Sequence, residues 1–329
     1  MLRLPRFKYL RPKSARDAAG MAAELGPRAM FVAGGTDLYP KLKRRQFEIE
    51  ALIGLDFLDR RIDGSHIGAG ATLADISTDA HLNERYRGYA QAAGLVSSPP
   101  LRHAGTAGGN LCVDTRCNYY DMTYEWRKAI GFCLKKDGEI CLVAPSSPRC
   151  WAVSSSDTAP MAMALGAMVT LTGPDGEREV PVASLYRDDG IVYLAKQPHD
   201  VVTGIDLRSA MTHSAYVKLR RRGSIDFPIA GAAVALRLDG DVVTDCRIAL
   251  SAVASHPLEA RAAAEFMVGK RVDEETVKAA ADLAAKPAKP LDNADLTHFW
   301  RKRMVRVVVE QAILAATRKA DSAVKLSGT

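Results

Sequence analysis

Five of the six cysteines of this 329-residue chain lie in one stretch, residues 108–151. Four of them are widely spaced, with 15, 7 and 8 residues between successive members. They are Cys117, Cys133, Cys141 and Cys150. This spacing differs from the paired cysteines of structural zinc sites and from the compact run of bacterial ferredoxins. Four thiolates in one loop predict a single metal centre, either zinc or an iron–sulfur cluster. Ordinary buried thiols are the less favoured alternative.

The rest of the chain argues against disulfides. The basic N-terminal residues 1–14 precede no apolar segment of a secretory signal, and no segment is apolar for long enough to cross a membrane. We therefore expect a cytoplasmic protein, without a membrane partner, whose thiols stay reduced. The net charge of +7 is dispersed, with short basic runs at residues 41–45 and 220–222. We interpret these runs as solvated surface and expect no nucleic-acid partner, although some cations could meet cofactor phosphates or a partner subunit.

Two glycine doublets, Gly34-Gly35 and Gly108-Gly109, each follow an apolar segment. The first lies between a predicted strand at residues 29–33 and a predicted helix at residues 38–45. Glycines let backbone N–H groups point inward, and a helix N-terminus favours negative charge, so this arrangement predicts an anion site. A tight turn is the alternative for one such segment alone. Two segments together predict a fold that brings both to one diphosphate.

The remaining patterns predict a mixed α and β fold. We expect a helix at residues 15–25 capped by Ser14, a second strand at residues 51–57 and a hairpin at residues 168–182. A three-stranded antiparallel sheet is expected at residues 215–220, 229–238 and 245–254, with Cys246 in its core. Helices follow at residues 257–268, 273–285 and 294–317. The core-facing side of the last helix is predicted to carry Phe299, Met304, Val307, Val308 and Ile313.

Four segments then resemble a known family. In order along the chain they are VAGGTDLYPKL, TAGGNLC, SSSDTAPMAMALGA and YVKLRRRGSIDFPIAGAAVAL. Together they are similar to the FAD-binding middle subunit of the molybdenum hydroxylases, which include xanthine dehydrogenases and aerobic carbon monoxide dehydrogenases. The resemblance implies an α+β fold, with an FAD-binding domain of the vanillyl-alcohol-oxidase-like (PCMH) type and a carbon monoxide dehydrogenase flavoprotein-like C-terminal domain. It implies two α/β subdomains, residues 1–57 and 58–210, before a C-terminal domain at residues 211–329.

An insertion at about residues 112–152 interrupts this pattern. It resembles the insertion in the β subunit of 4-hydroxybenzoyl-CoA reductases, which holds an additional 4Fe-4S cluster. The resemblance implies that Cys117, Cys133, Cys141 and Cys150 are the cluster ligands, whereas Cys112 lies beside the flavin site. Six aromatic residues flank the cysteines, and they could shield a cluster from water or form the core of the insertion. They are Tyr119, Tyr120, Tyr124, Trp126, Phe132 and Trp151.

The resemblance also assigns residues to FAD. One side of the diphosphate would be enclosed by Phe31, Val32, Ala33, Gly34, Gly35, Thr36, Asp37 and Leu38. The other side would be closed by Thr106, Ala107, Gly108, Gly109 and Asn110. Val96 and Val202 would line apolar parts of the flavin pocket, and Asp157 would hydrogen-bond the flavin or its ribityl chain. Lys218 would lie near the edge of the flavin ring, where a cation stabilises the reduced flavin.

The implied function is electron transfer within an oxidoreductase complex. The chain would carry no catalytic residues for the substrate and would join a large molybdenum-cofactor subunit and a small 2Fe-2S subunit, in a dimer of heterotrimers. In a 4-hydroxybenzoyl-CoA reductase-like complex, electrons from ferredoxin would pass through the 4Fe-4S cluster and FAD to 2Fe-2S and molybdenum, for reductive dehydroxylation. One alternative is an FAD subunit of another molybdenum hydroxylase that oxidises an aromatic or heterocyclic substrate. Another is a non-redox binding protein with a structural Zn(Cys)4 loop.

Overall fold

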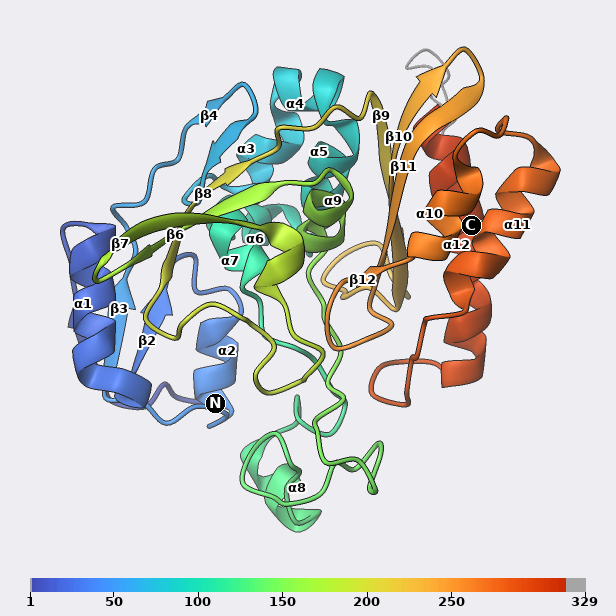
Figure 1. Ribbon diagram of the computed structural model, residues 1–329. Coiled ribbons are helices and arrows are strands. Elements are labelled where there is room, and N and C mark those ends of the chain that lie inside the picture. The colour runs from blue at the N-terminus through green and yellow to red at the C-terminus, as the bar shows by residue number, and fades with distance from the viewer. Residues whose placement is uncertain (1, 318–329) are drawn as a thin grey trace.

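Three β-sheets, each formed by a different part of the chain, organise the structure (Figure 1). The computed structural model describes residues 2–317. Helices lie around the sheets, and the insertion lies apart from them, at the bottom of the view in Figure 1. Within the described range, no helix is both long and apolar enough to cross a membrane. The division into domains at residues 1–57, 58–210 and 211–329 stays a prediction, and its last residues, 318–329, lie outside the described range.

The first sheet carries the first glycine doublet. Its order is β1 (Lys8–Leu10), β3 (Ala51–Gly54) and β2 (Ala29–Val32), with both pairings parallel. Two helices accompany it, α1 (Ala15–Leu25), which a 3-10 turn at Gly26–Arg28 links to β2, and α2 (Leu38–Lys43). Parallel neighbours need a crossover connection, which α2 supplies between β2 and β3. The predicted cap of α1 is confirmed, because the Ser14 side chain accepts a hydrogen bond from the Asp17 amide at 3.1 Å.

The second sheet holds the middle of the chain. Its strands pair antiparallel in the order β4 (Ile62–Asp63), β5 (His66–Gly68), β8 (Val201–Asp206), β6 (Met168–Gly173) and β7 (Gly176–Pro181). Short helices belong to the same part: α3 (Leu73–Thr78), α4 (Ala80–Arg85), α5 (Arg87–Gly94), α6 (Pro99–Ala104), α7 (Ala107–Leu111), α9 (Thr158–Ala164) and a 3-10 turn at Val182–Leu185. Buried alanines of α5 and α9 let their backbones approach closely in the main core.

The third sheet forms the C-terminal part. Its antiparallel order is β12 (Leu258–Glu259), β11 (Val242–Ser251), β10 (Ala230–Asp239) and β9 (His213–Leu219). The helices α10 (Arg261–Met267), α11 (Glu274–Ala285) and α12 (His298–Thr317) lie beside this sheet in Figure 1. The sequence predicts three of these strands. It misses β12, which pairs with β11 through two residues only and therefore leaves no alternating pattern.

The predicted core-facing side of α12 is partly wrong. Val308 and Ile313 are buried, but Phe299 is 74% exposed and Val307 is also exposed. The buried side instead begins at Arg301 and continues through Val305, Val308, Ala312 and Ala316. The Arg301 guanidinium is satisfied, because it donates to the carbonyls of Ile229, Leu291 and Ala252 and to the side chain of Asn293. Arg301, which its residue type would assign to the polar side of the helix, therefore belongs to the core.

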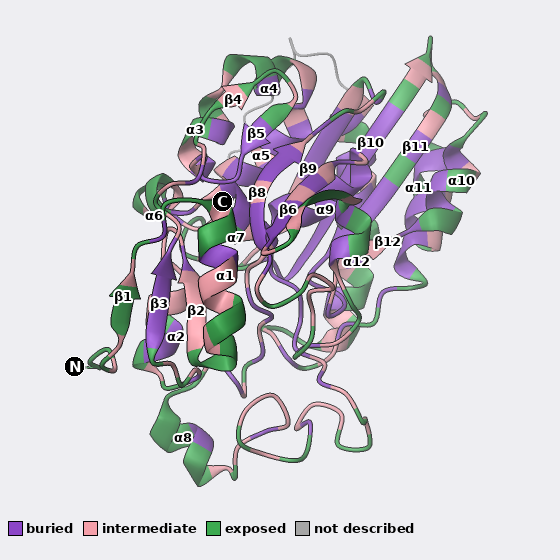
Figure 2. Cartoon of the chain, turned by 60° about the vertical axis from the view of Figure 1, so that its left-hand side comes forward, coloured by how far each residue is buried: buried purple, intermediate pink, exposed green. Residues whose placement is uncertain are grey.

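The insertion leaves and rejoins the body at Arg116 and Val153. Each of these two amides donates to the other residue's carbonyl, at 2.8 and 2.7 Å. Between them the chain is mostly irregular, with α8 (Tyr124–Ala129) as the helix described there. Figure 2 shows α8 with mostly exposed residues. Its buried Arg127 donates to the Arg44 and Arg45 carbonyls at 2.9 and 3.1 Å, which fastens the insertion to the end of α2.

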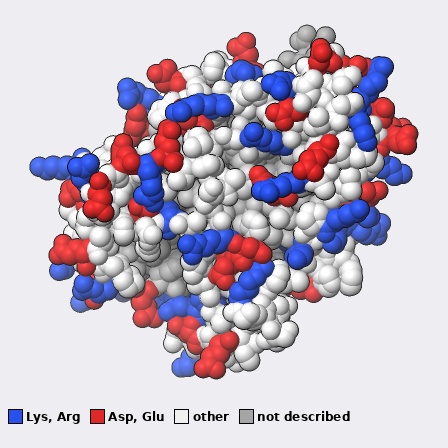
Figure 3. All heavy atoms as spheres, in the orientation of Figure 1, with Lys and Arg blue, Asp and Glu red and all other residues white. Residues whose placement is uncertain are grey.

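The interpretation of the first basic run as solvated surface is wrong for Lys41. Its side chain is 1% exposed, and its ammonium lies 2.7 Å from the Asp114 carboxylate. Burial lowers the pKa of Lys41, against the opposing charge of Asp114. Elsewhere the charges are dispersed, and Figure 3 shows cations and anions intermixed over the face of Figure 1. A basic run in a sequence therefore gives no information on which of its members pairs inside the fold.

Candidate functional site

The two glycine-rich segments lie against each other. A Cβ atom at Gly34 would overlap the carbonyl oxygen of Ala104 and would lie 3.2 Å from the Cα of Gly105. Both neighbours directly precede Thr106, so glycine at position 34 lets the end of β2 approach the second segment. Gly35 has a positive φ of 68°, which makes the turn from β2 into α2. The fold thus places the two predicted cofactor segments side by side.

The first segment presents unpaired backbone donors. Within residues 2–317, no backbone or side-chain group accepts a hydrogen bond from the amides of Gly34, Gly35, Thr36 or Asp37. Residues 33–39 are only half-buried, so these amides lie near the surface without partners. Successive N–H groups at a glycine turn before a helix form a concave site for an anion. Residues Phe31 to Leu38 therefore fit the diphosphate of a dinucleotide.

In the second segment, by contrast, three backbone amides already donate hydrogen bonds to other groups of the protein. It forms the first turn of α7, which the sequence does not predict because glycine has low helix propensity. The amides of Ala107, Gly108 and Gly109 donate to Ala71, Ala69 and the Thr106 hydroxyl. Asn110 accepts from the Ser156 hydroxyl and from the Thr158 amide and hydroxyl, and so joins α7 to the start of α9. These hydrogen bonds thus fix the position of residues Thr106 to Asn110 beside the first segment.

Asp157 and Lys218 form a buried ion pair at the predicted flavin pocket. The Lys218 ammonium lies 2.8 Å from one Asp157 oxygen, and the Tyr216 hydroxyl donates to the other at 2.8 Å. Lys218 also donates to the carbonyls of Leu95, next to Val96, and of Asp226. Burial raises the pKa of the Asp157 carboxyl, although Lys218 opposes this effect. The sequence misses Tyr216, which lies two residues before Lys218 in β9 and thus on the same face.

Replacement of Lys218 by methionine should lower the free energy of unfolding by roughly 3–5 kcal/mol, because Asp157 would stay buried without its cation. Urea denaturation at saturating FAD measures this loss. The double variant Lys218→Met/Asp157→Asn should lose less than Lys218→Met alone. An unchanged urea midpoint in the single variant would show that the pair does not stabilise the fold.

The other predicted FAD residues surround the same region. Val202 in β8 is buried, and its Cγ1 would lie 3.4 Å from a Cβ at Gly108. Val96 is half-buried just after α5, and Phe31 is half-buried at the end of β2. The Asp37 carboxylate pairs with Arg116, at the point where the insertion leaves the body. This pairing neutralises a carboxylate that would otherwise repel a phosphate.

The four widely spaced cysteines line one cavity. Its other walls include Tyr119, Tyr120, Lys135 and Leu142. Cys117, Cys133, Cys141 and Cys150 are all buried, and Cys112 and Cys246 do not line this cavity. Tyr119 and Tyr120 thus line the cavity, whereas Tyr124 and Trp126 are each 38% exposed, so shielding of a bound group stays a prediction. The cysteines are up to 33 residues apart in sequence, yet they face one space.

Burial shapes the chemistry of these thiols. It raises the pKa of Cys117 to about 12 and that of Cys150 to about 11. The Ala152 amide, 3.3 Å from the Cys150 sulfur, and the Lys135 charge act in the opposite direction on Cys150. Of the described His, Cys, Asp and Glu side chains, no three converge closely enough to hold a single metal ion. The thiols thus surround a space without meeting at one point.

Three features together are typical of a protein that holds an anionic dinucleotide. They are the free amides at the glycine turn, the neighbouring segment of small residues and the buried ion pair of Asp157 and Lys218. Residues 5–209 match the family described as FAD binding domain in molybdopterin dehydrogenase. Residues 214–316 match the family described as CO dehydrogenase flavoprotein C-terminal domain. The chain therefore belongs to the FAD-binding subunits of the molybdopterin dehydrogenase family.

Known proteins are similar along almost the whole chain. The carbon monoxide dehydrogenase medium chain of Hydrogenophaga pseudoflava is 28% identical over 318 residues, which are 95% of this chain and 97% of that one. The nicotinate dehydrogenase FAD-subunit of Eubacterium barkeri is 24% identical, over 93% and 94% of the two chains. A solved structure of carbon monoxide dehydrogenase from Hydrogenophaga pseudoflava superimposes with a TM-score of 0.76 at 28% identity, over 95% and 98% of the chains. The predicted fold class, FAD cofactor and oxidoreductase class are confirmed, and the individual site residues stay predictions.

Proposed function

We propose that this chain is the FAD- and 4Fe-4S-carrying electron-transfer subunit of a molybdenum complex of the 4-hydroxybenzoyl-CoA reductase type. The observation that carries the proposal is the cavity lined by all four insertion cysteines. Four buried thiols around one space match the ligand set of a 4Fe-4S cluster. When bound, FAD exchanges one or two electrons and an iron–sulfur cluster exchanges one.

The four thiols could hold either a cluster or a zinc ion. A tetrahedral zinc ion holds its four sulfurs at about 2.3 Å and so draws them to one point. A cluster places a separate iron at each thiolate, so its ligands stand farther apart. We propose the cluster because the insertion resembles that of 4-hydroxybenzoyl-CoA reductases, and metal analysis separates it from the Zn(Cys)4 alternative.

The chain's own residues would bind and position both groups. The amides of residues 34–37 would hold the FAD diphosphate, with residues 106–110 as the opposite wall. Lys218, fixed by Asp157 and the Leu95 carbonyl, would offer a cation to the flavin ring. Cys117, Cys133, Cys141 and Cys150 would lose their protons to become cluster ligands, and their aromatic neighbours would exclude water.

The complex would contain further subunits. Two similar proteins are named medium chain and FAD-subunit, terms for parts of larger assemblies. We therefore propose a large molybdenum-cofactor subunit and a small 2Fe-2S subunit as partners, in a cytoplasmic dimer of heterotrimers. Ferredoxin would be the electron donor, because an exposed insertion with its own cluster offers an entry point for electrons from outside the complex.

The purified protein should be coloured by two cofactors. We expect flavin absorption bands, a broad iron–sulfur shoulder and about four iron atoms per chain without stoichiometric zinc. Absorption spectroscopy with iron and zinc analysis measures this. One zinc ion and no iron per chain would contradict the cluster and support the structural zinc alternative.

Identifying the substrate requires an activity assay of the whole complex. With reduced ferredoxin or a reduced viologen, we expect the complex to dehydroxylate 4-hydroxybenzoyl-CoA. The second candidate is a molybdenum hydroxylase that oxidises an aromatic or heterocyclic substrate, which the similarity to a nicotinate dehydrogenase subunit favours. Oxidation of a heterocycle, without dehydroxylation of the thioester, would support that candidate.

A further inference from the structure

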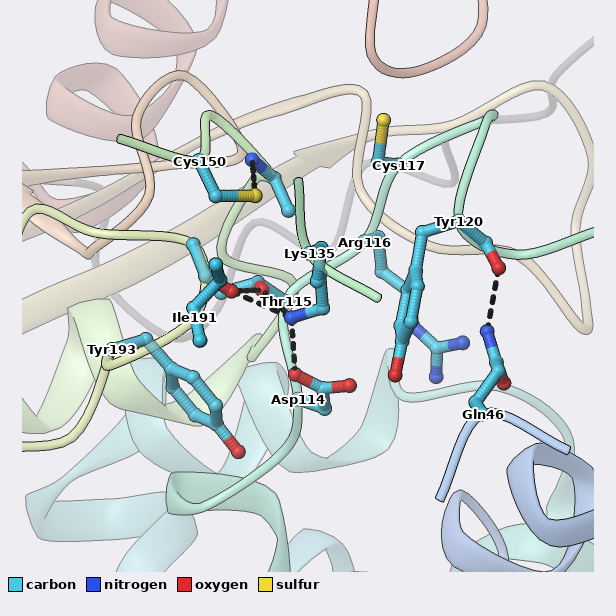
Figure 4. A network of polar contacts seen from close by, with 12 residues as sticks. Gln46, Asp114, Thr115, Arg116, Cys117, Tyr120, Lys135, Cys150, Ile191 and Tyr193 are labelled. Atoms are coloured by element: carbon cyan, nitrogen blue, oxygen red, sulfur yellow. Dashed lines mark hydrogen bonds and ion pairs between the residues drawn. The ribbon is translucent and has the colours of Figure 1, made fainter. Parts of the chain in front are cut away.

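A buried chain of charges connects the FAD-binding part to the cysteine cavity. The Asp114 carboxylate accepts a hydrogen bond from Lys41 on one oxygen at 2.7 Å. Its other oxygen accepts from Lys135, also at 2.7 Å, as Figure 4 shows. Lys41 belongs to α2, directly after the free amides, and Lys135 belongs to the insertion and lines the cavity. The Tyr120 ring contacts both cations, because its centroid lies 4.7 Å from the Lys41 ammonium and 4.8 Å from that of Lys135. All three charged side chains are at most 10% exposed.

Lys135 is held in one place. Besides Asp114, its ammonium donates to the Thr115 hydroxyl and to the Gly190 carbonyl, each at 2.6 Å. Gly190 in turn packs against Cys150, because a Cβ at this position would lie 2.6 Å from the Cys150 sulfur. The three contacts fix the ammonium beside the segment that carries this cysteine. The sequence misses Lys135, although its place two residues after Cys133 is a usable signal.

The three charges do not cancel. Two ammonium groups share one carboxylate, so Lys41, Asp114 and Lys135 together carry one positive charge in excess. Asp121 lies 3.7 Å from Lys41 but also pairs with Arg116 and Arg44, and in the described chain Asp114 is the one carboxylate paired with Lys135. Burying an uncompensated charge is costly, so an anionic group nearby would stabilise it. Four thiolates at the cavity would be such a group.

We infer that Lys135, fixed by Asp114, places a positive charge beside the cysteine ligands and makes the bound cluster easier to reduce. The inference rests on the proposed function, because it needs an iron–sulfur cluster in the cavity. A cluster that gains an electron gains a negative charge, and a cation in a poorly hydrated site stabilises that charge. The Ala152 amide near the Cys150 sulfur acts in the same direction.

Removing one cation or one anion from this group should shift the reduction potential of the cluster in opposite directions. The excess charge is +1 in the wild type, 0 in Lys135→Met, +2 in Asp114→Asn and +1 again in the double variant. We expect the cluster midpoint potential to fall in Lys135→Met, rise in Asp114→Asn and return towards the wild type in the double variant. A redox titration of the cofactor-loaded complex, followed by electron paramagnetic resonance, measures the potential directly.

The neighbouring Lys136 provides the matched control. It pairs with Glu48 and Asp137 at the edge of the insertion and does not line the cavity, so Lys136→Met should leave the potential unchanged. A purely structural role of Lys135 would instead lower iron content or stability in both single variants, without potential shifts of opposite sign. Shifts of the same sign, or none, in a wild-type protein that contains its cluster would overturn the inference alone. A wild type without iron would overturn the inference and the proposed function together.

Discussion

Replacement of Cys133 by serine should remove about four iron atoms per chain and the iron–sulfur absorption, while FAD stays bound. Cys133 is one of the four thiols around the cavity, and a serine hydroxyl is a poor substitute for a thiolate ligand. The amides of residues 34–37, which we propose as the FAD-binding groups, follow β2 of the first sheet and do not depend on this thiol. A buried hydroxyl without a partner costs only about 1–3 kcal/mol, so the chain should still fold. Iron analysis and the flavin absorption of the purified variant measure both outcomes.

The matched controls are the two cysteines outside the cavity. Cys112 ends α7 beside the flavin segment, and Cys246 lies in the core of the third sheet. Cys112→Ala and Cys246→Ala should therefore retain iron and flavin at wild-type levels. If Cys133→Ser also retained its iron, the assignment of the four ligands would be wrong.

Replacement of Gly34 by alanine should abolish FAD binding. The new Cβ would overlap the Ala104 carbonyl, which belongs to the backbone and cannot rotate away. The two glycine-rich segments would have to separate, and the free amides of residues 34–37 would leave their place opposite residues 106–110. Such overpacking typically costs about 1–3 kcal/mol, so the melting temperature should also fall. Flavin content after purification and a thermal melt measure the two effects.

Gly20→Ala is the control for this substitution. Gly20 lies inside α1, and a Cβ there would have no atom within 4 Å. Alanine should keep FAD bound and stabilise the helix by up to about 1 kcal/mol. Normal flavin content in Gly34→Ala would mean that the close approach of the two segments is not needed for the cofactor.

Local patterns in the sequence predict much of this fold. Ser14 caps α1, a glycine doublet ends β2, and the hairpin of β6 and β7 forms where turn residues separate two alternating runs. The second glycine doublet shows the limit of such reasoning. Its residues have low helix propensity, but the Thr106 cap and the bonds to Ala69 and Ala71 hold them in α7. Tertiary contacts override propensity here.

Buried charges were the least predictable part of the site. Lys41 and Asp114 are 73 residues apart, and nothing near either residue in the sequence indicates the other. Arg301 lies among three cations in a row, yet it alone enters the core, where backbone carbonyls accept its hydrogen bonds. Long-range pairing depends on the finished fold, so residue type alone misplaces these side chains. The cysteine cavity was predictable, because four thiols in one loop have few other uses.

The hydrogen-bonded pair of Arg116 and Val153 has an evolutionary consequence. Because both ends of the insertion meet at these two residues, the segment between them can be acquired, lengthened or deleted in one genetic event. Lengthening a closed loop is inexpensive, since each doubling costs only about 0.6 kcal/mol. The glycine-rich segments and Asp114 lie outside the exchanged portion and would keep their positions, whereas Gln46, which donates to the Tyr120 carbonyl, would lose its partner. An ancestral flavoprotein of this family could thus gain the proposed cluster-binding segment as one unit, without rebuilding its FAD site.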